Sequence, residues 1–68
     1  MTRYEAIYHQ KETDKEFRDY YYADSDYIAA MLAWGNCESD EYLYITNTET
    51  GETFLVDDGA TLAAVPEV

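Results

Sequence analysis

One stretch of this chain has the composition of a helix, and its position limits the folds open to the rest. Residues 27–34 (Tyr-Ile-Ala-Ala-Met-Leu-Ala-Trp) contain mostly strong helix formers. Residues 24–26 (Asp-Ser-Asp) precede them, and such side chains accept hydrogen bonds from the free N–H groups of a first helical turn. Gly35 follows and is expected to end the helix in a left-handed conformation.

Strand-like segments flank the predicted helix on both sides. Four segments rich in aromatic and β-branched residues are predicted to be strands: residues 4–10, 17–23, 41–46 and 53–56. They form two hairpins, and Asn47 and Gly51 predict the tight turn of the second one. Residues 57–59 (Asp-Asp-Gly) predict a further turn. Residues 60–65 fit either a short edge strand or a helical turn.

This order predicts a single α+β domain spanning residues 1–68. Two hairpins separated by one helix (ββαββ, with a further β if residues 60–65 pair) form one antiparallel sheet of four or five strands, with the helix on one face. Ile28, Met31 and Leu32 have the spacing of one helical face and are expected to point into the core. The other face of the sheet is expected to be open to water.

The tyrosines predict an aromatic surface outside that core. In a strand, successive side chains point to opposite faces. If Leu43 and Ile45 are buried, Tyr42 and Tyr44 lie on the outer face, and residues 20–22 (Tyr-Tyr-Tyr) cannot all be internal. Two interpretations stay open, since exposed tyrosines are enriched at interfaces but also pack on each other across strands.

The charge is strongly negative and unevenly distributed. The chain has a net charge of −11, yet its first 18 residues hold all four bases and only four of the acids. From Asp19 onward there are 11 acids and no Lys or Arg. A small domain needs a net charge of only about 2–8 for solubility. A surface of this kind attracts basic protein surfaces and repels nucleic acid and anionic membranes.

The chain contains few of the residue types that catalysis or zinc binding requires. Cys37 is the one cysteine and His9 the one histidine, fewer than the four ligands of a structural zinc site. Acidic neighbours raise the pKa of the Cys37 thiol, which opposes nucleophilic catalysis. We therefore expect no enzyme, no cofactor, no dedicated metal site and no membrane span. A reducing cytoplasm is the expected location, with a Cys37-linked dimer as an open alternative.

Rows of carboxylates suggest a surface shaped to meet nucleic-acid-binding residues. Alternate positions of a strand lie about 6.6 Å apart, close to twice the roughly 3.4 Å axial spacing of phosphates along a DNA strand. The candidate partner-binding acids are Asp19, Asp24, Asp26, Glu38, Asp40, Glu41, Glu49, Glu52, Asp57 and Asp58. The candidate partner-binding tyrosines are Tyr20, Tyr22, Tyr42 and Tyr44.

The small size, the acids between Asp19 and Asp58, and the tyrosines at positions 20–22, 42 and 44 resemble one group of proteins. These are the small acidic inhibitors of phages and mobile elements, including anti-CRISPR, anti-restriction and other DNA-mimic proteins. The resemblance is one of type, without a shared motif, and the bases near the N-terminus depart from the purest mimics. It implies an inhibitor in the bacterial cytoplasm that occupies the basic surface of a CRISPR effector or restriction enzyme.

Two alternatives belong to other classes. In the first, Trp34, Tyr42 and Tyr44 form a patch for homodimerisation or docking, and the acids serve only solubility. Salt separates this from mimicry, because apolar docking survives salt that screens charges. In the second, the chain is a small cation-binding or enzyme-like domain, which a metal- or substrate-dependent thermal shift would reveal.

Overall fold

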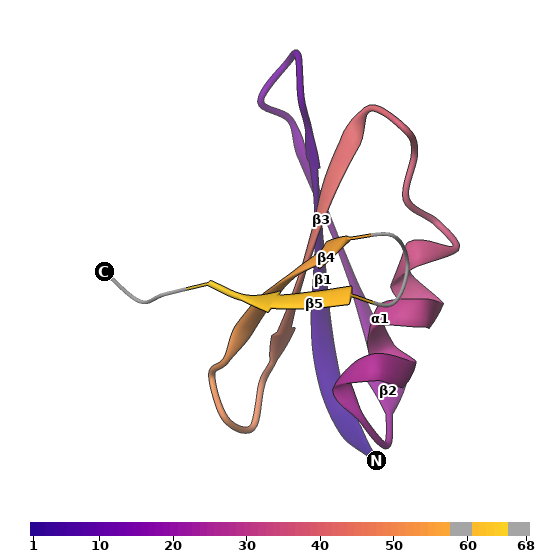
Figure 1. The fold of residues 1–68 in the computed structure, drawn as a ribbon, viewed down its shortest axis with the longest axis vertical. Helices are drawn as coiled ribbons and strands as arrows, with labels where there is room; N and C mark the ends of the chain where they lie inside the picture. Colours follow the sequence, from indigo (N-terminus) through magenta and orange to yellow (C-terminus); the bar gives the residue numbers. More distant parts are fainter. Residues whose placement is uncertain (58–60, 66–68) are drawn as a thin grey trace.

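The computed structural model describes residues 1–57 and 61–65, which form five strands and one helix (Figure 1). The elements are β1 (Thr2–Gln10), β2 (Glu16–Ala23), α1 (Asp26–Trp34), β3 (Glu41–Asn47), β4 (Thr53–Asp57) and β5 (Thr61–Ala64). The α+β prediction is therefore confirmed, and the predicted bounds of the first four strands and the helix are correct to within two residues. Of the predicted turn at residues 57–59, Asp57 belongs to β4 and the other two residues lie outside the described part.

All strands join one antiparallel sheet in the order β2-β1-β3-β4-β5. Both predicted hairpins are present, since β1 pairs with β2 and β3 with β4. The last segment takes the strand alternative, and β5 pairs with β4 as an edge strand. The N-terminal ends of β3 and β5 lie at the same end of the sheet as the β1–β2 turn, because neighbouring strands alternate in direction.

The second hairpin turn follows its sequence signals. The side-chain oxygen of Asn47 accepts hydrogen bonds from the backbone N–H groups of Glu49 (2.9 Å) and Thr50 (3.2 Å). Gly51 has a φ of 79°, a conformation that costs other residues more than glycine. This turn therefore fixes the register of β3 against β4.

The helix begins as predicted and ends differently. Ser25 is the N-cap, and its hydroxyl accepts a hydrogen bond from the Ile28 N–H at 3.2 Å. The left-handed conformation predicted for Gly35 is wrong, because its φ of −58° and ψ of −21° are right-handed. The chain leaves the helix by continuing in tighter right-handed turns, in which Asn36 N–H donates to the Ala33 carbonyl.

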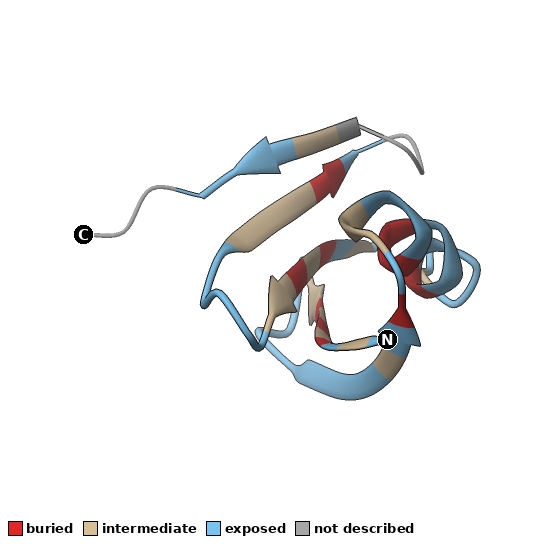
Figure 2. Cartoon of the chain, turned by 90° about the horizontal axis from the view of Figure 1, so that it is seen from below, coloured by how far each residue is buried: buried red, intermediate tan, exposed pale blue. Residues whose placement is uncertain are grey.

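The core lies between the helix and the concave side of a curved sheet (Figure 2). Among the side chains that the structure describes, the buried ones are Tyr4, Ala6, Tyr8, Ala23, Ala29, Ala30, Ala33, Leu43, Ile45 and Val56, from β1, β2, α1, β3 and β4. The sheet supplies the large ones, and the helix contributes only alanines. The interior is therefore filled from the strands, and the helix approaches them closely.

Two tyrosines of β1 explain this arrangement. The Tyr4 hydroxyl donates to Asp26 Oδ1 at 2.6 Å, and the Tyr8 hydroxyl donates to the Ala33 carbonyl at 2.8 Å. Their rings occupy the space beneath the first and last turns of α1. Burial is the main reason that the pKa of Tyr4 is raised to about 12, with the Asp26 hydrogen bond second. Burial likewise raises the pKa of Tyr8, helped by its contact with Tyr21.

The prediction that Ile28, Met31 and Leu32 face the core is wrong. Their exposed fractions are 41%, 58% and 48%. With two tyrosine rings already below the helix, only the alanine side fits against the sheet. The helix is therefore rotated so that its bulky side chains point outward.

Candidate protein-binding surface

The outward side of α1 is an apolar surface, which we call the outer helix face. It consists of Tyr27, Ile28, Met31, Leu32 and Trp34, with exposed fractions of 62%, 41%, 58%, 48% and 39%. At about 100° per residue, these side chains span an arc of roughly 160°. The three buried alanines span the opposite arc.

No residue between Tyr27 and Trp34 is charged, and Tyr27 carries the one side-chain hydroxyl of the segment. A helix that is apolar all round is normally buried on all sides. Here the sheet covers only one side, and large apolar groups remain in water on the other. Contiguous exposed apolar surface of this kind marks interaction sites in soluble proteins.

The charges nearest to this face in the sequence are acidic. Asp24 is exposed just before α1, and Glu38 is exposed just after it. The chain has no Lys or Arg after Arg18. Arg3 and Arg18 lie on the side of the sheet away from the helix, because they are in register with the outward-facing Tyr22 and Ile7 rather than with buried residues. The outer helix face thus combines an apolar centre with acidic residues on both sides of it in the sequence.

The predicted carboxylates do not form a single row. Asp24, Asp26, Glu49 and Glu52 lie at the end of the sheet where β2 and β3 finish, while Glu38, Asp40, Glu41 and Asp57 lie at the opposite end. Asp19 is exposed within β2, between the two groups. Asp58 lies outside the described residues. The structure therefore brings the acids together as two groups at opposite ends of the sheet.

Several of these acids already have structural partners. Asp26 accepts from the Tyr4 hydroxyl and lies 3.4 Å from the Asn47 amide, and Glu41 Oε1 accepts from the Glu38 backbone N–H at 2.9 Å. Asp40 accepts from Gln10 at 3.1 Å. Asp26, Asp40 and Glu41 therefore already accept hydrogen bonds within the protein, which reduces their capacity to bind a partner.

The predicted alternation of tyrosines in β3 is confirmed. Leu43 and Ile45 are buried, whereas Tyr42 is 47% exposed and Tyr44 is half-buried on the outer side. Tyr22 is 61% exposed on the same side of the sheet.

Tyr20 belongs to a charged network on that side. The Arg3 guanidinium lies 4.1 Å from its ring centroid, and its hydroxyl donates to Glu5 Oε2 at 3.1 Å. Arg18 forms an ion pair with the other Glu5 oxygen at 3.0 Å. Both arginines therefore serve contacts within the sheet, which favours a structural role for Tyr20.

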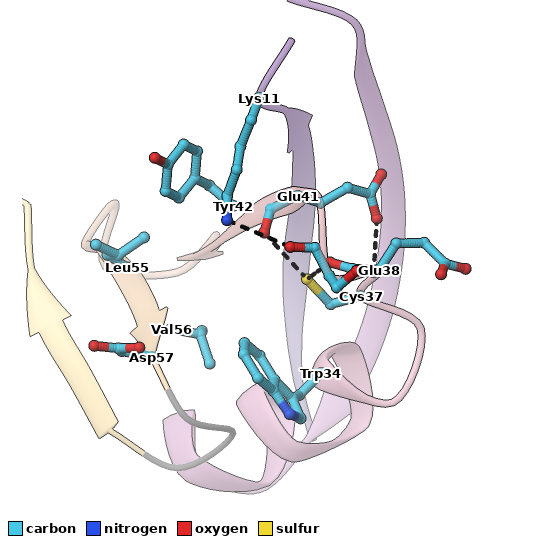
Figure 3. A pocket seen from close by; sticks show the side chains of 10 residues that line it. Lys11, Trp34, Cys37, Glu38, Glu41, Tyr42, Leu55, Val56 and Asp57 are labelled. Atoms are coloured by element: carbon cyan, nitrogen blue, oxygen red, sulfur yellow. Dashed lines mark hydrogen bonds between the residues drawn. The ribbon is translucent and has the colours of Figure 1, made fainter.

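A pocket of about 450 Å³ opens beside the end of α1 (Figure 3). The residues that line it are Lys11, Trp34, Cys37, Glu38, Ser39, Glu41, Tyr42, Leu55, Val56 and Asp57. Trp34 and Tyr42 lie on opposite sides of the opening in this view. The pocket adjoins the outer helix face, because Trp34 belongs to both.

Cys37 and His9 have separate surroundings. The Cys37 sulfur lies 3.6 Å and 3.8 Å from the backbone oxygens of Glu38 and Glu41. Burial raises the pKa of this thiol, and the Glu41 carboxylate raises it further. The raised pKa favours the protonated Cys37 thiol, which works against a nucleophilic role. His9 lies elsewhere, between Asp14 (3.4 Å) and Glu16 (3.5 Å).

Comparison with known proteins does not assign a family or function to this chain. No protein-family model, curated protein or solved structure matches the chain. In residues 1–57 and 61–65, no three His, Cys, Asp or Glu side chains are grouped to hold a metal ion. No helix in the part of the chain that the structure describes is both long enough and apolar enough to cross a membrane.

Sequence reasoning missed most of the outer helix face. It included Trp34 in a candidate patch but assigned Ile28, Met31 and Leu32 to the core. A signal was present, since the three alanines of the segment also fall on one side of a helix. The i, i+3, i+4 spacing of Ile28, Met31 and Leu32 predicted the bulkier side as the buried one, although the alanine side shows a helical spacing too.

Proposed function

We propose that this protein binds a basic surface of another protein and thereby keeps nucleic acid away from that surface. The observation that carries the proposal is the outer helix face, a bulky apolar surface left in water on an acidic, base-free part of the chain. The expected targets are CRISPR effectors or restriction-type nucleases, the class that the resemblance to small acidic inhibitors implies. The protein acts by occupying its target, without catalysis.

The proposed contact has the usual anatomy of a protein interface. The centre of an interface is apolar and rich in aromatic residues and Met, and its rim is polar. Tyr27, Met31 and Trp34 would form such a centre, docked into an apolar groove as amphipathic helices do. Exposed acids such as Asp24 and Glu38 would form the rim, speed association and disfavour acidic partners.

A second copy of the chain is the alternative partner, and the same exposed face favours it. Two copies could bury Trp34 and their outer helix faces against each other. Each copy carries a net charge of −11, however, and like charges across an interface oppose association. The heterologous basic partner is therefore the better fit, and sedimentation at low and high salt tests the alternative. A dimer at low salt would contradict our preference.

The test is capture from bacterial lysate with tagged wild type and two variants. Met31→Asp places a charge in the outer helix face, whereas Phe17→Asp places the same charge at a comparably exposed apolar residue of β2. We expect wild type and Phe17→Asp to capture a nucleic-acid-binding protein that DNA displaces. Met31→Asp should lose it while keeping a native circular dichroism spectrum. Capture that DNA does not displace, or that survives Met31→Asp, would overturn the proposal.

A further inference from the structure

The pocket at the end of α1 has the walls of a site for a flat, positively charged group. It lies between the α1–β3 connector, the start of β3 and the end of β4. Trp34, Tyr42, Leu55 and Val56 give it apolar walls (Figure 3). Its volume of about 450 Å³ is within the range of roughly 300–1,000 Å³ that small ligands occupy. A single long side chain would therefore fit.

A cation already lies at the edge of this pocket. The Lys11 ammonium is 4.8 Å from the centroid of the Tyr42 ring and 3.4 Å from the Ser39 carbonyl oxygen. Among the described residues, no carboxylate lies within 4.0 Å of it. In this acidic protein the ammonium is thus held by an aromatic face and a carbonyl, which shows that the pocket edge accommodates positive charge.

The opposite wall offers a second aromatic face. Trp is the best side chain for binding a cation over its ring. Within the described residues, cations lie over the rings of Tyr20 and Tyr42 but not over Trp34. Trp34 is 39% exposed, so part of its side chain can meet a cation from outside.

The charges around the pocket favour a cationic ligand over an anionic one. Its lining contains three carboxylates and one ammonium. Glu41 is engaged by the Glu38 backbone N–H, whereas Asp57 is exposed at the end of β4. Asp57 leaves β4 on the same side as Leu55, the side of the sheet that also carries Tyr42, and can pair there with a cation that enters the pocket.

We infer that this pocket takes an arginine side chain of the bound partner. The inference rests on the proposed function, because the arginine belongs to the basic surface that the outer helix face contacts. Arginine fits better than lysine, since its planar guanidinium stacks on aromatic rings, is weakly hydrated and pairs with carboxylates through two hydrogen bonds. Trp34 joins the pocket to the outer helix face, so one partner can engage both.

Trp34 is the only tryptophan, so its fluorescence reports directly on the pocket. The probes are N-acetyl-arginine amide, the corresponding lysine amide and the neutral citrulline amide, which has nearly the shape of arginine without its charge. We expect a saturable fluorescence change with the arginine probe, a weaker one with lysine and none with citrulline. Equal responses to the arginine and citrulline probes, or no saturable response to arginine, would overturn the inference.

Three variants separate this pocket from general attraction to an acidic protein. Asp57→Asn should weaken arginine binding by up to about fivefold, the range of an exposed ion pair. Glu52→Gln removes the same charge at the other end of the sheet and should change nothing. Lys11→Met removes the competing ammonium and should strengthen binding. Equal losses in Asp57→Asn and Glu52→Gln, or weaker binding in Lys11→Met, would contradict the inference.

The two proposals can fail separately. If the arginine probe does not bind but target capture still depends on Met31, the pocket inference is wrong and the proposed function stands. If the probe binds but capture ignores Met31→Asp, the pocket takes a guanidinium and the outer helix face is not the docking surface.

Discussion

On α1, shortening a large outward side chain should destabilise the protein less than enlarging a buried alanine. Met31→Ala and Leu32→Ala remove large apolar groups, whereas Ala33→Leu adds one. In most helices the first two would be the damaging changes. Here we expect Ala33→Leu to be the most destabilising of the three, because Ala33 is fully buried and the other two residues are about half exposed.

The expected magnitudes follow from burial. Burying a whole Met or Leu side chain is worth about 1.5–3 kcal/mol. With exposed fractions of 58% and 48%, Met31→Ala and Leu32→Ala should each cost about 1 kcal/mol or less. Inserting the extra carbons of Leu at position 33, where the exposed fraction is 0%, forces the helix away from Tyr8 and should cost about 1–3 kcal/mol.

Urea and thermal denaturation followed by circular dichroism measure these differences. In a domain of this size, 1 kcal/mol shifts the melting temperature by about 4–8 °C. If Met31→Ala and Leu32→Ala each cost about 2–5 kcal/mol, the range for truncating a core residue, while Ala33→Leu is harmless, the helix faces the sheet with its other side. That result would refute both the core and the docking surface described above.

Three further predictions concern the fold. The pKa of Tyr4 is about 12 in the folded protein and 10 in a free tyrosine, so the unfolded chain loses this proton at lower pH than the folded protein does. The contribution of Tyr4 to the free energy of unfolding should therefore be complete below pH 10 and fall by about 3 kcal/mol towards pH 12. Urea midpoints across this pH range should show the fall, and Tyr4→Phe should reduce it while the raised pKa of Tyr8 leaves a remainder in the same direction. Ser25→Ala removes the N-cap and should cost about 0.5–2 kcal/mol in urea unfolding, whereas an unchanged midpoint would show that the cap contributes nothing. Gly51→Ala has open space for its methyl group but a φ of 79°, so it should cost about 1–2 kcal/mol in the same assay, and a stabilised variant would contradict the turn geometry.

The elements of this fold could be predicted because their signals are local. Ser25 is a favourable N-cap, and Asn47 and Gly51 specify a turn whatever surrounds them. Period-2 alternation then placed Tyr42 and Tyr44 on the outer face once Leu43 was taken as buried. These inferences need only a few neighbouring residues, and the structure confirms them.

The orientation of α1 could not be predicted because it depends on distant residues. Periodicity identifies two sides of the helix, but both are apolar, and the choice between them is made by Tyr4 and Tyr8 of β1. Their hydroxyls find hydrogen-bond partners on α1 only if the alanine side faces inward. The candidate site was missed for the same reason, since an outward Met31 follows from that tertiary constraint. The two-ended placement of the acids likewise required the strand order.

The hydroxyl contacts of Tyr4 and Tyr8 have a consequence for how this protein can change over evolutionary time. They attach α1 to the sheet from its inner side, so the most exposed outward positions, Tyr27, Met31 and Leu32, contribute little to holding the fold together. Those positions are free to vary in shape and chemistry while the scaffold stays intact. A lineage built on this scaffold can therefore follow a changing target by altering one helix surface, much as an antibody domain varies its loops on a constant framework.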